Sequence, residues 1–193
     1  MASKVDLINN ALRKIAGSPV VSPNEETPEA YHAGAAFDAV RDTVLSDYPF
    51  AFAMKLGRLA QVAEAPAFGF ANAFQLPVDL LYLVDVRGSG SMTEKPVAHS
   101  IVGNEVHTDE AECCVRYIVR HDNTAFWPPH FCRAFETLLA AELAPIFGAG
   151  TTAGAKLREE YSMLLEEAAA QDARQQNAPA IAWEPQAMTA REG

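Results

Sequence analysis

The sequence predicts an α+β fold, mainly α, in which a four-helix core of two N-terminal and two C-terminal helices receives an inserted small antiparallel β-sheet. Two observations support this architecture. Apolar residues recur every three or four positions towards both ends of the chain, as they do on one face of a helix. The middle instead contains short β-branched or aromatic segments that are separated by glycine-rich turns. An extended C-terminal tail completes the predicted fold.

A chain of 193 residues with 49% hydrophobic content can bury one ordinary hydrophobic core. We expect an N-terminal helical hairpin over 1–49, a β insertion over 50–122, a C-terminal helix pair over 123–176 and an extended tail over 177–193. The sequence contains no run of about 18 apolar residues that would predict a membrane span, and no signal-sequence pattern. We therefore expect a soluble protein.

The two N-terminal helices are predicted from their caps. Ser3 followed by Asp6 resembles a capping box. Thr27 is the expected N-cap of the second helix, with Pro28 at its first position and acidic residues where the helix dipole favours them. This second helix should cover 28–47. A short loop marked by prolines joins the two helices, which predicts that they pack as a hairpin.

The strands and the last two helices are predicted from changes in residue pattern. Short β-branched or aromatic segments predict the strands of one sheet, at 80–86, 97–102, 105–108 and 114–120. Helical spacing returns after Pro128 and Pro129, which predicts a third helix. A fourth helix should begin at about Thr152, with apolar residues on one face and glutamates on the other.

Charge and cysteine content exclude some functions. The formal charge of -10, from 25 acidic and 15 basic side chains, opposes binding to a phosphate backbone. An acidic surface would still suit the wall of a channel through which DNA slides. Three cysteines, of which Cys113 and Cys114 are adjacent, argue against a disulfide framework and fit a reducing cytoplasm.

One group of residues has the composition of a catalytic metal site. Cys113, Cys114, His121, His130 and Cys132 lie close together in the sequence. Adjacent residues of a strand point to opposite faces, and residues two apart on a helix point in different directions, so this spacing argues against zinc. We expect no metal, no cofactor and no enzymatic activity. A small metal-dependent hydrolase that uses these residues is the alternative, as is an unrelated soluble helical binding module.

Several short stretches carry a resemblance to a known family. They are the helix that ends Ile-Ala-Gly-x-Pro at 15–19, the helix end over 41–52 with its Pro-aromatic boundary, Phe-Gln-Leu-Pro-x-Asp at 74–79, and Arg-Tyr-Ile at 116–118. In these stretches and in its order of elements, the chain resembles the tail tubular protein A (gatekeeper) family, the head-to-tail adaptors of short-tailed phages. The resemblance covers nearly the whole chain, in element order more than in identity.

The resemblance implies a structural head-tail connector. Members of this family form a dodecameric ring between the portal protein and the tail nozzle, so the expected partners are further copies of the chain, the portal, and the nozzle or another downstream tail protein. DNA would pass through the channel without sequence-specific binding, and no membrane would be involved. The protein would be assembled in the host cytoplasm and lie in the tail or neck of the virion.

The resemblance and the residue pattern together suggest two sets of contact residues. By resemblance, the 177–193 tail would dock on the portal, and its candidate contacts are Ile181, Trp183, Glu184, Pro185 and Met188. Arginines and aromatic residues outside regular helices are enriched at subunit interfaces. The candidate contacts between subunits are Arg41, Phe50, Phe52, Arg116 and Arg120.

Overall fold

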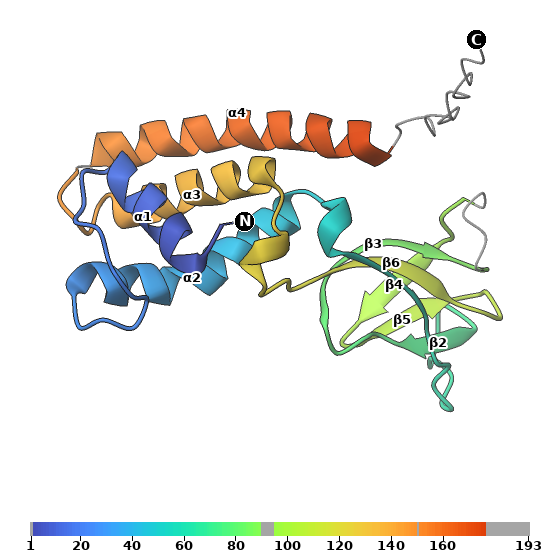
Figure 1. Cartoon of the computed structure of the whole chain (residues 1–193). Coiled ribbons are helices and arrows are strands. Elements are labelled where there is room, and N and C mark those ends of the chain that lie inside the picture. The colour runs from blue at the N-terminus through green and yellow to red at the C-terminus, as the bar shows by residue number, and fades with distance from the viewer. Residues whose placement is uncertain (1, 90–94, 150, 177–193) are drawn as a thin grey trace, which may run out of the picture.

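The computed structural model describes residues 2–89, 95–149 and 151–176, which form a helical part and a β part joined end to end (Figure 1). The helices are α1 (Lys4–Lys14), α2 (Pro28–Asp47), α3 (Pro129–Leu143) and α4 (Thr151–Gln176). The strands are β1 (Met54–Arg58), β2 (Asn72–Gln75), β3 (Leu80–Arg87), β4 (His99–Val102), β5 (Glu105–Thr108) and β6 (Cys114–Val119). Two short 3-10 helices, η1 (Ala51–Ala53) and η2 (Thr124–Phe126), lie where the chain passes between the two parts. Within the described ranges, no helix is long and apolar enough to cross a membrane.

Both predicted N-terminal caps are confirmed. The Ser3 hydroxyl accepts the Asp6 N–H at 3.1 Å, and the Asp6 carboxylate accepts the Ser3 N–H at 2.9 Å, which completes a capping box. The hydrogen bond from the Ser3 N–H to the Asp6 carboxylate lowers the pKa of Asp6. The Thr27 hydroxyl accepts the Ala30 N–H at 3.3 Å, and α2 begins at Pro28 as predicted.

The helix α3 is the centre of the helical part. It is buried on most of its circumference, and α1, α2 and α4 each pack against it (Figure 1). α1 and α2 pack mainly against α3, and they also contact each other where Lys4 Nζ lies 4.3 Å from the Phe37 ring centre; the expected hairpin stays a prediction. α3 can take several partners because its buried residues lie on several sides, whereas an amphipathic helix offers a single apolar stripe.

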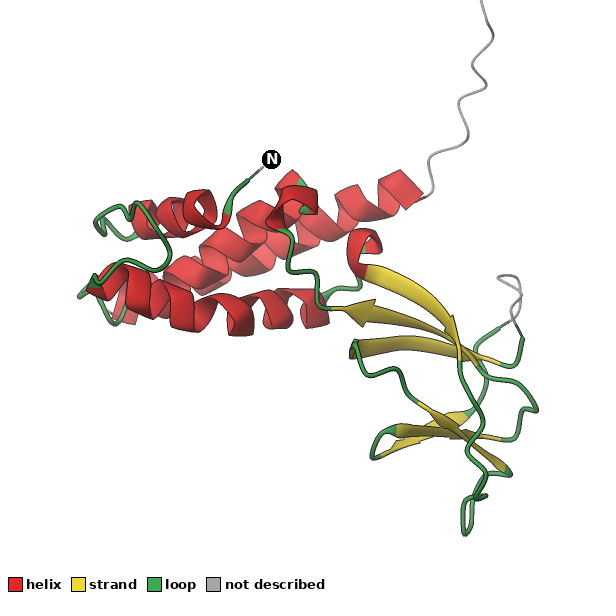
Figure 2. Cartoon of the chain, turned by 60° about the horizontal axis from the view of Figure 1, so that its bottom comes forward, coloured by secondary structure: helices red, strands yellow, loops and turns green. Residues whose placement is uncertain are grey.

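The predicted fold class is wrong in its β component. The chain does not insert one small sheet into a four-helix core; it forms two three-stranded antiparallel sheets, with strand orders β1-β6-β3 and β2-β5-β4 (Figure 2). The four predicted strands correspond to β3, β4, β5 and β6, but β1 and β2 were not expected. Both lie among Ala, Gly and charged residues with no clear strand pattern, and their pairing with β6 and β5 joins segments that are distant in sequence.

The two sheets enclose a hydrophobic core of their own. Val86 and Val115 from the first sheet lie in this core with Phe74 and Val106 from the second. Successive residues of a strand point to opposite faces, and β6 uses both: Ile118 points the other way and belongs to the core of the helical part. The first sheet therefore lies between the helices and the second sheet, and β6 contributes to both cores.

Candidate functional site at the junction of the two parts

The polar and aromatic side chains that most constrain the molecule gather where the helical part meets the β part. We call this region the junction; it consists of the second half of α2, η1 with the residues beside it, and the 120–127 link from β6 to α3. Two chain segments cross it, one through η1 into β1 and the other from β6 into η2. The geometry of the junction therefore sets how the two parts are oriented.

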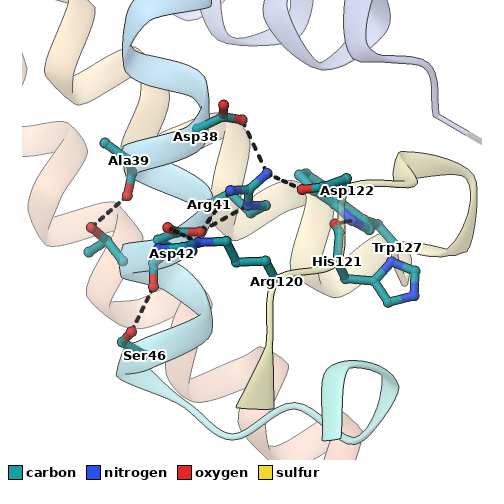
Figure 3. Close-up of polar contacts among 10 residues, drawn as sticks. Asp38, Ala39, Arg41, Asp42, Ser46, Arg120, His121, Asp122 and Trp127 are labelled. Atoms are coloured by element: carbon teal, nitrogen blue, oxygen red, sulfur yellow. Dashed lines mark hydrogen bonds and ion pairs between the residues drawn. The ribbon is translucent and has the colours of Figure 1, made fainter. Parts of the chain in front are cut away.

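Arg41 of α2 is the centre of an ion-pair cluster at the junction (Figure 3). Its side chain is only 7% exposed, and its Nη1 donates to Asp38 at 3.1 Å and to Asp122 at 2.5 Å. Its Nε and Nη2 both donate to Asp42, at 3.0 and 2.9 Å. Asp42 accepts a further hydrogen bond from Arg120 Nε at 2.7 Å. This hydrogen bond raises the pKa of Arg120.

This cluster ties the β6–α3 link to α2 at two points. Asp122 and Arg120 belong to the link, whereas Arg41 and Asp42 belong to α2. The fork of the guanidinium group holds its carboxylate partners in fixed directions, which a lysine cannot do. The cluster therefore restrains the angle between α2 and β6, the strand that contributes to both hydrophobic cores.

Aromatic rings fill the other side of the junction. Phe50 is fully buried, and its ring lies 5.1 Å from the Phe131 ring centre. Phe52 lies 4.9 Å from Phe131 and 5.6 Å from the ring of His121. Trp127 completes the group, because its indole N–H donates to the His121 carbonyl at 2.8 Å. These edge-to-face contacts pack η1 against the start of α3.

The end of α4 also reaches the junction. Asp172 is 2% exposed, and its two carboxylate oxygens accept the Ala51 N–H at 3.3 and 3.2 Å. Nearby, the Tyr48 hydroxyl donates to the Ala169 carbonyl at 3.3 Å. About three turns of helix before Asp172, Tyr161 of α4 donates to Asp47 at 2.5 Å. Burial is the main cause that raises the pKa values of Tyr48 and Tyr161.

A separate ion-pair cluster lies within the β part. Asp85 is 7% exposed and accepts hydrogen bonds from Arg116 Nε at 2.8 Å and from Arg87 Nη2 at 3.1 Å. Burial opposes ionisation of Asp85, but the hydrogen bonds from the two arginines lower its pKa overall. The pair Asp85–Arg116 joins β3 to β6 and stabilises the first sheet.

The residues considered for metal chemistry are not assembled into a metal site. Within the described residues, no group of three or more His, Cys, Asp or Glu is placed to hold a metal ion. Cys113 and Cys132 are buried, and burial raises the pKa of each thiol to about 11. Both thiols are therefore protonated at neutral pH and are poor nucleophiles. His121 and His130 each contact a phenylalanine of the junction instead, Phe52 and Phe50 respectively.

Burial of His130 predicts a pH dependence of stability. Burial lowers its pKa below 6.5, although the charge of Asp172 acts in the opposite direction, and its buried Nε2 has no hydrogen-bond partner among the residues that the structure describes. The unfolded chain therefore takes up a proton at higher pH than the folded chain does, so the free energy of unfolding should fall as the pH drops below about 6.5. Urea denaturation at pH 7.5 and 5.5 measures this loss, which should be smaller in His130→Leu. His99→Leu, which removes an exposed histidine, is the control; equal losses in wild type and His130→Leu would contradict the prediction.

The structure places the five proposed subunit-contact residues differently from one another. Arg41 and Phe50 are buried inside the chain, so neither side chain is exposed for a neighbouring molecule. Phe52 is half-buried at the junction, and Arg116 is held by Asp85. Arg120 is the most accessible, with 60% of its side chain exposed beside its ion pair with Asp42. A role of these residues in subunit contacts stays a prediction.

The candidate portal contacts Ile181, Trp183, Glu184, Pro185 and Met188 lie outside the described residues, and their role also stays a prediction.

Sequence reasoning missed the acidic partners of the junction. Asp38 lies three residues before Arg41, which is a local signal for ion pairing on a helix, whereas Asp42 directly follows Arg41 at a spacing that predicts no pair. Asp172 gives no such signal, because it is one of many acidic residues along α4.

The fold and the junction define a two-part α+β scaffold whose parts are joined by ion pairs, packed aromatic rings and the contact of α4 with η1. No protein-family model matches the sequence, and no curated protein matches it either.

Proposed function

We propose that this chain is a structural head-tail connector of a tailed phage. Copies of it would form a ring between the portal protein and a downstream tail protein and enclose the DNA channel. One observation carries the proposal: the helical part, at its end far from the β part, and the β part itself each carry a group of exposed apolar side chains, and side-chain contacts at the junction join the two parts.

The first exposed apolar group lies at the end of the helical part that is far from the β part. It consists of Val21 in the α1–α2 loop, Tyr31 at the start of α2 and Ile146 in the α3–α4 loop, which are 89, 72 and 50% exposed (Figure 1). Exposed apolar side chains that gather in one place mark contact surfaces. This end of the helical part is therefore suited to contact another molecule.

The second exposed apolar group belongs to the β part. Phe68 is 89% exposed in the loop before β2, and Ile101 and Val102 of the edge strand β4 are each 52% exposed. Because the two groups belong to different parts of an extended molecule (Figure 2), they cannot cover each other within one chain. Two different contact surfaces on one chain allow head-to-tail association, which closes into a ring when the angle between copies is constant.

The junction supports ring closure because its contacts hold the helical part and the β part of each copy in one relative orientation. The buried guanidinium of Arg41 joins α2 to the β6–α3 link through its ion pair with the exposed Asp122, and Phe50 packs η1 against α3. The net charge of -10 is consistent with a channel wall that does not retain a polyanion. The chain beyond Gln176 would then extend from the end of α4 to the portal.

Truncation tests this proposal. A chain that ends at Gln176 should keep its far-UV circular dichroism but lose binding to the portal protein of the same phage, because the proposed portal contacts are removed. Size-exclusion chromatography with light scattering and electron microscopy of the mixtures measure binding and ring formation. Phe68→Ser, which changes the β part alone, is the control and should still bind the portal. Portal binding by the truncated chain would remove the docking role of 177–193, and absence of any ring with the full chain would remove the connector role.

A further inference from the structure

We propose that Asp172 couples the end of α4 to the β part, so that the state of the last turn of α4 and the position of η1 and β1 change together. The inference rests on the proposed connector function only for its biological purpose: docking of 177–193 on a portal would alter the β part that receives the downstream protein. The coupling itself is a property of the single chain.

The contact that carries the coupling joins a buried side chain of α4 to the backbone of η1. Asp172 is 2% exposed, and its carboxylate accepts the N–H of Ala51, the first residue of η1, at 3.3 and 3.2 Å. Hydrogen bonds from a backbone N–H to a carboxylate are generally stronger than those between neutral groups. The described part of α4 ends at Gln176, four residues after Asp172. Whatever pulls on or orders the end of α4 therefore acts within about one turn of this contact.

The contact leads directly to the β part. Met54 begins β1 immediately after η1, and its N–H bonds back to the Ala51 carbonyl. β1 then pairs with β6 from Met54 to Arg58. Displacement of Ala51 should therefore be passed to the first residues of the edge strand, because only two residues separate Ala51 from Met54 and a hydrogen bond joins them. The segment at η1 is the shorter of the two connections that cross the junction.

Amide hydrogen exchange measured by NMR on the full-length chain tests the coupling in both directions. Asp172→Ala should speed exchange by about tenfold or more, not only at Ala51 but also through η1 and into β1. Asp172→Asn keeps an acceptor and should give a smaller effect, which keeps the test valid if the alanine variant folds poorly. The reciprocal variant is Ala51→Pro, which removes the N–H donor at a position where proline fits, because Phe50 before it is extended with ψ 134°. It should speed exchange in 172–176 by a similar factor.

A matched control removes the same kind of bond elsewhere. Asp109 accepts the Ala71 N–H at 3.0 Å within the β part, and Asp109→Ala should leave exchange at η1 and in α4 unchanged. Effects of Asp172→Ala confined to Ala51, or an unchanged rate in 172–176 of Ala51→Pro, would overturn the coupling.

A second measurement separates this inference from the proposed function. Exchange over η1 and β1 is compared with and without the portal protein of the same phage, for wild type and Asp172→Asn. A change in wild type that is lost in the variant supports the coupling. Portal binding without any change at η1 would overturn the coupling but leave the connector function standing. Failure of the portal to bind would remove the connector function, and the reciprocal test on the free chain would still decide the coupling.

Discussion

Replacing Phe50 with alanine should lower the free energy of unfolding by about 3–5 kcal/mol, which is the range for removing a buried aromatic ring. Phe50 has no exposed surface, and its ring contacts Tyr48 at 4.8 Å, Phe131 at 5.1 Å and His130 at 6.0 Å. The rings around it come from the end of α2 and the start of α3, so the cavity cannot close without moving a helix. Urea denaturation followed by far-UV circular dichroism measures the loss.

The matched control for this prediction is Phe68→Ala. It removes the same side chain from a loop where it is 89% exposed, and the free energy of unfolding should change by less than about 0.5 kcal/mol. Similar losses in the two variants would show that Phe50 does not hold the junction together. A large loss in Phe50→Ala alone is the expected result.

Replacing Arg41 with alanine should lower the free energy of unfolding by about 2–4 kcal/mol. The arginine side chain is 7% exposed, and its removal leaves three carboxylates close together without their shared cation. The loss should lie below that of a fully buried ion pair, because Asp38 and Asp122 are 70 and 81% exposed and regain water. Arg41→Lys keeps the charge without the planar fork and should lose a smaller amount.

The control for Arg41 is an arginine with an exposed partner. Arg58 forms an ion pair with Glu112 in which the two side chains are 63 and 51% exposed, so Arg58→Ala should cost less than about 1 kcal/mol. Thermal and urea unfolding compare the two variants at the same ionic strength. If Arg41→Ala and Arg58→Ala lower the free energy of unfolding by equal amounts, the cluster at the junction stabilises the chain no more than an ordinary surface ion pair does.

Local signals in the sequence predicted the helix starts and four of the strands. Ser3 and Thr27 are caps because their hydroxyls reach N–H groups three residues away, and such short-range chemistry is visible in the sequence. The arrangement of the β part was not visible. β1 pairs with β6 across more than fifty residues, for instance Met54 with Ile118, and no local pattern specifies which distant strand is the partner.

The junction shows the same division between local and distant information. Arg41 could be paired with Asp38 from their spacing on one helix. Its ion pair with Asp122, which lies 81 residues further along the chain, has no such local signal. The contact of Asp172 with Ala51 spans 121 residues and depends on how α3 positions α4, so only the three-dimensional structure reveals it.

The central position of α3 has a consequence for synthesis on the ribosome. Since α1 and α2 pack mainly against α3, they lack their main partner until residue 143 has left the exit tunnel. By then every strand of the β part has already been made. The β part of a nascent chain should therefore fold before the helical part. Until α3 is available, the apolar faces of α1 and α2 stay exposed to other molecules in the cell.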